Sequence, residues 1–232
     1  ALIIIGYGFL SSLSAEPAFN TVRWIVENKK SKILILHPNA SSVGALDLGF
    51  GEETNSQKLI SESDVIYKIG ADDVAVPPEK YIIYQGSHGD KGASAADLIL
   101  PSACYLEEDG MFVNTEGRVQ FSRKAINVPG SAKENWKILR ALLGECNMPV
   151  SWNSLNELRN EIFESAPSVN KFGEQSTYEL KSSVKLNKIN SGATIKCQIK
   201  DFYLTNVICR ASNTMAELSR LRKNNILLDK VS

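Results

Sequence analysis

Short apolar runs and amphipathic stretches alternate along the first two thirds of the chain. The apolar runs are Ala1–Gly6, Lys32–Leu36, Val65–Ile69, Tyr81–Tyr84 and Leu98–Leu100. They are nearly continuous rather than alternating with polar residues, which is typical of strands covered on both faces. The pattern therefore predicts an α/β layered fold, Rossmann-like, with a mainly parallel sheet.

Helical periodicity occupies the intervals and continues beyond the last of these strands. Residues 18–26 place apolar side chains at helical spacing, so an amphipathic helix is expected after the first strand. Ser131 with Glu134, and Ser154 with Glu157, each fit a capping box, in which serine and glutamate satisfy backbone donors at a helix start. These spacings predict two further helices, beginning after Ser131 and Ser154.

The C-terminal third changes character twice. Residues 165–194 are rich in Ser, Asn and Lys without a sustained period, which indicates a long exposed loop or an extended arm. Apolar positions return at helical spacing over residues 207–221, and Thr205 or Asn206 can cap that helix. The predicted division is a Rossmann-like α/β domain (1–164), a polar arm (165–200) and a C-terminal helical tail (201–232).

The charges are balanced in total but not along the chain. The formal net charge of zero gives no general attraction to nucleic acid or to an anionic membrane. Residues 1–180 carry 16 basic and 23 acidic side chains, whereas residues 181–232 carry 10 and 3. A basic tail after an acidic body indicates either docking on an acidic surface, of this chain or of a neighbour, or a solvated lysine-rich end.

Cysteine spacing gives no sign of a metal centre. Cys104, Cys146, Cys197 and Cys209 lie far apart and form no C-x-x-C pair, whereas zinc and iron-sulfur sites gather several thiolates. We expect free thiols in a reducing compartment. No apolar run approaches the roughly 20 residues that span a bilayer, so direct membrane insertion is not expected.

Two glycine-containing loops are candidate ligand sites. Gly6-Tyr7-Gly8 follows a strand as in dinucleotide-binding motifs, but Ser11 stands where the third glycine belongs, which favours a plain strand-to-helix turn. His88-Gly89-Asp90 also follows a strand, yet no nucleophile motif accompanies it. We interpret His88, like His37, as a hydrogen-bonded structural residue.

A run of polar residues between Asn114 and Gln120 is the strongest candidate site. Glu116 and Arg118 are two residues apart, so in an extended segment both charges face one side. Such a pair can pin the loop through hydrogen bonds to backbone or bind a polar ligand, and we favour pinning. The predicted structural residues are Asn114, Glu116, Gly117 and Arg118, with no catalytic, cofactor-binding or metal-binding residue.

Seven short motifs follow one another along the chain. They are Gly44–Phe50, Tyr81–Asp90, Ala96–Pro101, Glu107–Gly110, Val113–Gln120, Glu134–Leu142 and Asp201–Thr205. As a series they resemble the molybdopterin oxidoreductase superfamily, most closely the branch that became the large iron-sulfur subunit of respiratory complex I. The resemblance covers nearly the whole chain but only the C-terminal part of that subunit.

What the resemblance implies is a structural, non-redox portion of an oxidoreductase. It implies a fold incomplete relative to the molybdopterin oxidoreductases, no cofactor in this chain, and iron-sulfur clusters on the missing N-terminal portion or a companion chain. The implied partners are other peripheral-arm subunits of complex I, including the iron-sulfur half of the same subunit. The implied location is the matrix side of the mitochondrial inner membrane, or the cytoplasmic side in a bacterium.

Two alternatives stay open at this point. One is a fragment of an independent molybdopterin-dependent oxidoreductase such as a formate dehydrogenase. The other is a free nucleotide-binding module. The lack of cluster and metal ligands weighs against the first, and the broken glycine motif weighs against the second.

Overall fold

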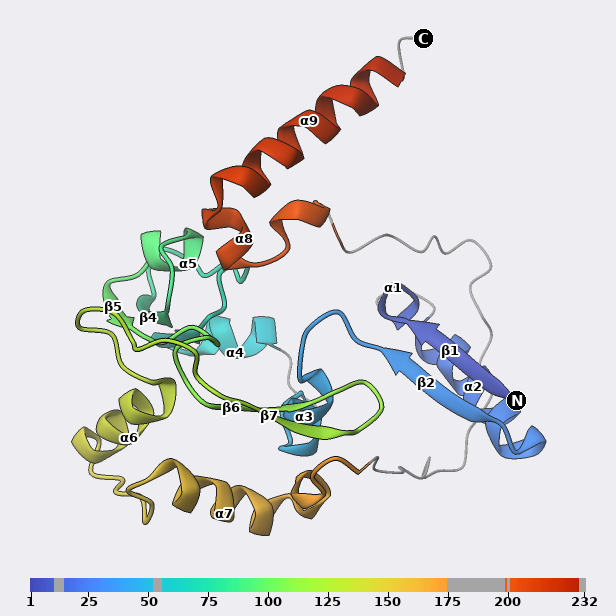
Figure 1. Cartoon of the computed structure of the whole chain (residues 1–232), viewed down its shortest axis with the longest axis horizontal. Helices are drawn as coiled ribbons and strands as arrows, with labels where there is room; N and C mark the ends of the chain where they lie inside the picture. The colour runs from blue at the N-terminus through green and yellow to red at the C-terminus, as the bar shows by residue number, and fades with distance from the viewer. Residues whose placement is uncertain (11–14, 52–55, 175–198, 200, 230–232) are drawn as a thin grey trace. The chain divides into compact units, whose positions relative to one another are not determined.

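The computed structural model describes residues 1–10, 15–51, 56–174, 199 and 201–229 (Figure 1). Contacts divide the chain into two compact units that interleave along the sequence. Unit 1 comprises 1–52, 111–122 and 154–198, and unit 2 comprises 53–110, 123–153 and 199–232. The predicted boundaries at residues 164 and 200 stay a prediction, and most of the expected polar arm lies outside the described residues.

Unit 1 begins with two parallel strands. β1 (Leu2–Gly6) pairs with β2 (Lys32–Leu36) in a register that sets Leu2 beside Lys32. α1 (Tyr7–Leu10) and α2 (Ala15–Lys29) lie between them in the sequence. The expected amphipathic helix after the first strand is therefore confirmed, and Gly6-Tyr7-Gly8 forms a strand-to-helix turn.

The core of unit 1 lies between a hairpin and three short helices. The hairpin consists of β6 (Gly110–Val113) and β7 (Val119–Ser122), and the helices are α3 (Ser42–Asp47), α7 (Leu155–Ser165) and the 3-10 helix η1 (Pro167–Asn170). Val113, Val119, Ala166 and Val169 are buried together at its centre. The Ser154 hydroxyl accepts from the Glu157 N–H at 3.2 Å, which confirms the predicted cap of α7.

Unit 2 is built on a three-stranded parallel sheet. Its strands are β3 (Val65–Ile69), β4 (Tyr81–Gly86) and β5 (Leu98–Pro101), in that order. The helices α4 (Ser56–Glu62), α5 (Lys91–Ser94) and α6 (Asn135–Glu145) belong to the same unit. The α/β class with mainly parallel pairing is confirmed. In the described residues the parallel strands form one sheet in each unit, because the chain passes from unit 1 to unit 2 between β2 and β3.

The predicted capping box at Ser131 is wrong. Helix α6 begins after Glu134, whose side chain makes no capping hydrogen bond. The Glu134 carboxylate instead accepts from Trp136 Nε1 at 3.0 Å and pairs with Lys137 at 2.9 Å. A carboxylate from a distant turn, described below, accepts from the first backbone donor of α6.

The expected terminal helix is present but divided. The 3-10 helix η2 (Phe202–Leu204) precedes α8 (Val207–Ala211) and α9 (Asn213–Asp229). Asn206 caps α8 by accepting from the Cys209 N–H at 2.9 Å, as predicted for one of the two candidates. Ser212 has an extended backbone and separates α8 from α9. No helix in the described ranges has both the length and the apolar character required to cross a bilayer.

Glycines allow one large side chain to be buried in unit 2. Tyr84 on β4 is 1% exposed, and a Cβ atom at either Gly86 or Gly92 would lie 2.5 Å from it. A separation below 3.0 Å forces the ring to move, and the ring is enclosed. Glycine at these two positions is therefore a packing requirement rather than a conformational one.

We predict that Gly92→Ala lowers the free energy of unfolding by about 1–3 kcal/mol, the usual cost of forcing extra volume into a packed interior. The matched control is Gly89→Ala in the preceding loop, where the new Cβ would meet no atom within 4 Å. Urea unfolding of both variants measures the difference. Equal midpoints for the two would show that the Tyr84 ring is not enclosed as described.

Candidate functional site

Three consecutive acidic residues after β5 act as acceptors for backbone donors. Glu107 accepts from the Cys104 N–H at 3.0 Å, and Asp109 accepts from the Lys124 N–H at 2.9 Å. Glu108 accepts from the Asn135 N–H at 2.8 Å, which is the first donor of α6. This acidic turn, which lies in the Glu107–Gly110 motif, therefore joins three separate segments of unit 2.

Glu108 also belongs to a polar network between α6 and the sheet. Asn135 donates its side-chain amide to Glu108 at 2.6 Å and accepts from the fully buried Gln85 at 2.6 Å. Tyr67 donates to the Gln85 side-chain oxygen. Burial raises the pKa of Glu108, although the two hydrogen bonds from Asn135 oppose the shift. The network joins β3, β4 and α6 through satisfied polar groups.

A second cluster in unit 2 surrounds the guanidinium of Arg210 on α8. Arg210 Nε lies 2.5 Å from Asp90, and its terminal nitrogens lie 3.8 Å from Asp72 and from Asp73. The Asp72 side chain is 2% exposed, and the Arg210 side chain is 21% exposed. Asp72 also accepts from the Tyr84 hydroxyl at 2.9 Å and from the Gly92 N–H at 3.2 Å.

The charged groups in this cluster stabilise one another's charged forms, which lowers the pKa of Asp90 and raises the pKa of Arg210. Burial alone would raise the pKa of Asp90, but hydrogen bonds from Arg210 and the Lys91 N–H lower it overall. Burial alone would lower the pKa of Arg210, but Asp90 raises it, with Asp73 and Asp72 adding to the effect. Burial and the hydrogen bond to Asp72 raise the pKa of Tyr84 to about 12. The tyrosine therefore stays protonated as a donor at neutral pH.

Part of the basic tail docks on an acidic surface of this same chain, which is one of the two surfaces expected from the sequence. Helix α8 is held by acidic residues of this same chain, Asp72, Asp73 and Asp90. A further acidic residue, Asp201, accepts from the Ser219 hydroxyl at 2.5 Å and pairs with Lys223 at 3.2 Å, which joins η2 to α9. Local sequence patterns do not reveal the pairing of Arg210 with Asp90, because the two residues are 120 positions apart.

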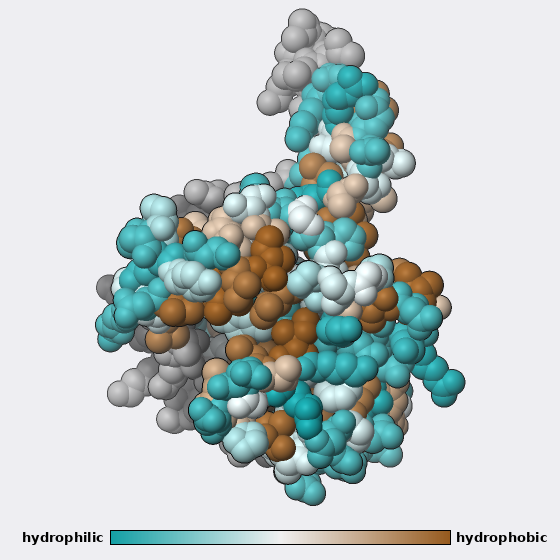
Figure 2. All heavy atoms as spheres, turned by 90° about the vertical axis from the view of Figure 1, so that its left-hand side faces the viewer, coloured by the Kyte–Doolittle hydropathy of each residue, from teal (hydrophilic) through white to brown (hydrophobic). Residues whose placement is uncertain are grey.

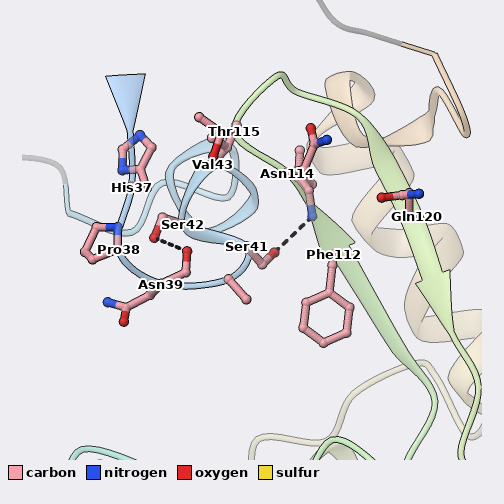
Figure 3. A pocket seen from close by; sticks show the side chains of 12 residues that line it. His37, Pro38, Asn39, Ser41, Ser42, Val43, Phe112, Asn114, Thr115 and Gln120 are labelled. Atoms are coloured by element: carbon pink, nitrogen blue, oxygen red, sulfur yellow. Dashed lines mark hydrogen bonds between the residues drawn. The ribbon is translucent and has the colours of Figure 1, made fainter. Parts of the chain in front are cut away.

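Unit 1 contains a pocket of about 370 Å³ at the end of β2 (Figure 3). Its walls are the loop after β2, the start of α3 and the end of the β6–β7 hairpin. Ser41 has a left-handed backbone (φ 61°), and its hydroxyl accepts from the Val113 N–H at 3.1 Å. A Cβ at Gly44 would lie 2.9 Å from Val113, so α3 packs closely against β6. The lining residues are His37, Pro38, Asn39, Ala40, Ser41, Ser42, Val43, Phe112, Val113, Asn114, Thr115 and Gln120.

The predicted site residues lie at the hairpin end beside this pocket. Asn114 lines it, and the Asn114 side-chain oxygen accepts from the N–H groups of Glu116 and Arg118 at 3.0 and 2.9 Å. Gly117 has φ +80°, which favours glycine, and donates to the Asn114 carbonyl at 2.9 Å. The expectation of an extended segment is wrong here, because these residues form a tight turn.

Within this turn Glu116 and Arg118 have different surroundings. Arg118 donates to the Gly173 carbonyl, whereas the Glu116 side chain is exposed. The carbonyl acceptor agrees with a pinning role for Arg118, which stays a prediction. No sequence pattern indicates Gly173 as the partner, since it lies 55 residues away, after η1.

The two histidines have different surroundings. His88 bonds to the neighbouring Ser87 hydroxyl at 2.9 Å, and His37 lines the unit 1 pocket. Cys104, Cys146 and Cys209 are free thiols, and Cys197 lies outside the described residues. Within the ranges that the structure covers, no three His, Cys, Asp or Glu side chains are placed to hold a metal ion.

Comparison with known families gives two matches that together cover most of the chain. Residues 1–145 match the molybdopterin oxidoreductase family model. Residues 167–218 match a model for the C-terminal region of a subunit of NADH-ubiquinone oxidoreductase.

Individual relatives match along nearly the full sequence. The chain is 37% identical to the NADH-ubiquinone oxidoreductase 75 kDa subunit of Reclinomonas americana, over 97% of this chain and 34% of the relative. It is 35% identical to the mitochondrial 78 kDa subunit of Neurospora crassa, over 96% and 32%. It is 33% identical to the mitochondrial NADH dehydrogenase [ubiquinone] iron-sulfur protein 1 of Solanum tuberosum, over 96% and 31%. The chain thus spans about a third of the length of these relatives.

The first family model raises the question of a molybdenum-pterin cofactor. Such a cofactor is anionic through its phosphate and needs cationic side chains or aligned backbone donors. The unit 1 pocket is lined by amides, hydroxyls and apolar groups, and His37 is its one ionisable lining residue. The Val113 N–H is already bonded to Ser41. The described lining therefore offers no arginine or lysine to hold the phosphate of such a cofactor.

We predict that Arg118→Ala lowers the free energy of unfolding by about 1 kcal/mol, the net worth of one hydrogen bond at a partly exposed site. The matched control is Glu116→Ala in the same turn, whose side chain is exposed, so its stability should be unchanged. Chemical denaturation of both variants tests this. Unchanged stability of the arginine variant, with loss of a bound small molecule, would favour a ligand role instead.

We predict that Arg210→Ala destabilises the chain by about 2–4 kcal/mol, because it leaves the buried Asp72 carboxylate without its cation. Arg210→Lys should recover only part of this, since an ammonium keeps the charge but not the planar fork. Urea unfolding of the three chains at pH 7 measures both effects. Equal stability of all three would contradict the cluster.

We also predict that the difference between wild type and Arg210→Ala shrinks as the pH falls below about 4, the ordinary range of an aspartate pKa. Asp90 has a lowered pKa in the folded chain, so its contribution is present above the ordinary aspartate pKa and is lost on acidification. Urea unfolding of the pair, repeated at pH values from neutral to acidic, measures the change. A difference independent of pH would contradict the ion pair.

Proposed function

This chain belongs to the molybdopterin oxidoreductase family, and we propose that it is a structural, non-redox part of the large iron-sulfur subunit of respiratory complex I. The observation that carries the proposal is the match of nearly the whole chain to the 75 and 78 kDa subunits of NADH-ubiquinone oxidoreductase. A fragment of a formate dehydrogenase is not favoured, because these relatives are subunits of NADH-ubiquinone oxidoreductase.

The chemistry of the described polar groups supports a structural role. The acidic turn of residues 107–109 accepts three backbone N–H groups, and Asp72 and Asp90 are engaged by Tyr84, Gly92 and Arg210. Carboxylates used in this way fix segments of the chain. General acid or base catalysis instead needs such a group within reach of a reacting proton.

Exposed apolar side chains support a role within an assembly. Figure 2 shows patches of hydrophobic residues at the surface. In unit 2, the Leu106 carbonyl accepts from the backbone of Ile126, and the side chains of both residues and of Tyr105 are exposed. Apolar patches of this kind are typical of surfaces that another protein covers.

The proposed partners are the other subunits of the peripheral arm, including the portion of the same large subunit that binds iron-sulfur clusters. The proposed location is the matrix side of the mitochondrial inner membrane, or the cytoplasmic side in a bacterium. The clusters that relay electrons would then lie outside this chain, which would position them without carrying one. No cofactor is proposed for this chain.

Affinity purification through a tag on this chain, under native conditions, tests the proposal. We expect a large assembly that oxidises NADH with an artificial acceptor and contains iron-sulfur subunits. The same chain, produced alone and purified under native conditions, should carry no stoichiometric iron or molybdenum. Recovery of the chain outside any NADH-oxidising assembly, or with near-stoichiometric molybdenum, would contradict the proposal.

A further inference from the structure

Helix α9 has a docked face and an open face. Of its residues with described side chains, 213–224, only Ser219 is buried, and it bonds to Asp201 of η2. Lys223, one turn further on, pairs with the same carboxylate. Figure 1 shows α9 running beyond η2 and α8. These contacts within unit 2 therefore hold one side of α9, at Ser219 and Lys223.

The open face carries an apolar stripe. Leu218 is 37% exposed and Leu221 is 47% exposed, and they lie three residues apart, so their side chains are neighbours on the helix surface. A helix of this length gains most of its stability from packing its apolar face, and here that face is open.

The charges beside the stripe are mainly basic. Residues 213–224 contain Arg220, Arg222 and Lys223 against the single acidic Glu217. Arg220 pairs with Glu217 at 2.7 Å, and Lys223 pairs with Asp201 at 3.2 Å. Arg222, which follows Leu221 directly, makes no ion pair among the described residues. A partner that covers the stripe therefore gains by presenting a carboxylate next to it.

We propose that the open face of α9 docks an amphipathic helix of a partner subunit, with apolar side chains over Leu218 and Leu221 and an acidic side chain facing Arg222. The inference rests on the proposed function, because the partner is another protein of the same assembly. Recognition between helices uses apolar anchors three and four residues apart, and Leu218 and Leu221 give α9 itself such a spacing.

An anionic membrane surface is a weaker occupant. Peripheral membrane helices carry a clustered basic face of about four to eight lysines or arginines, together with aromatic or leucine anchors. The described part of α9 has three basic residues, and two of them are engaged in ion pairs. In this part of the helix, Arg222 is the one basic residue without an ion pair. It can bind a single carboxylate of a protein partner, but it is too little charge for an anionic membrane surface.

Variants of the full chain, expressed with a tag in its native host, test the docking. Leu218→Asp with Leu221→Asp should reduce recovery in the native assembly by roughly a hundredfold, since each buried leucine is worth about tenfold or more in binding. Arg222→Glu should give a loss of about tenfold. The matched control is Asn224→Asp, an exposed position of the same helix outside both the stripe and the docked face, which should leave recovery unchanged. Circular dichroism of each purified chain should show that the helix content is retained.

Cross-linking identifies the occupant. A photoreactive residue in place of Leu221 should join a peptide of another subunit that carries Asp or Glu at helical spacing from apolar residues. Cross-linking to lipid, or assembly of the leucine variants at the level of the control, would overturn the inference. If the unaltered chain enters no NADH-oxidising assembly, the proposed function is wrong. If the wild type and the leucine variants all assemble normally, the proposed function stands and only the docking inference is wrong.

Discussion

A buried carboxylate, that of Asp72, is the constraint on which unit 2 depends. Removing a charged carboxylate from water is costly unless hydrogen bonds and a counter-charge compensate for it. Three groups provide that compensation: the Tyr84 hydroxyl, the Gly92 N–H and the Arg210 guanidinium. They come from β4, α5 and α8, so satisfying one side chain brings together the sheet, a short helix and the C-terminal tail. The tail is thereby part of the fold of unit 2 rather than an appendage.

The same use of acidic side chains recurs through the chain. Asp97 accepts from the Ile82 N–H at 2.7 Å, next to the sheet, and Glu108 accepts the first donor of α6 at 2.8 Å. Asp201 joins η2 to α9 in a similar manner. These carboxylates stabilise the fold of the chain itself. A stable fold can in turn hold neighbouring subunits in place. This chemistry agrees with the proposed place in a large oxidoreductase assembly in which other parts carry the electrons.

Sequence patterns predict the parallel strands β1 to β5 well, but not the β6–β7 hairpin, and they predict the long-range polar contacts poorly. Continuous apolar runs such as Val65–Ile69 are visible locally because strand burial determines them, and Asn206 is predictable as a cap because capping is a local bond. The extended segment expected at residues 114–120 is wrong at its start, since alternating charges do not reveal the left-handed backbone of Gly117. The partners of Glu108 and Arg210 are not predictable in this way, because no local pattern connects residues that far apart.

Hydrogen exchange of Asp72→Asn beside the wild-type chain tests most directly whether this carboxylate holds the tail in the fold. Asparagine keeps the shape of the side chain but removes the charge that attracts Arg210. The account predicts that the backbone amides of α8 lose protection, because the charge that attracts Arg210 is gone, whereas the Gly92 N–H keeps an acceptor in the remaining side-chain oxygen. The amides of the β6–β7 hairpin, most of which belongs to unit 1, should keep theirs. Unchanged protection of α8 in the variant would contradict the account.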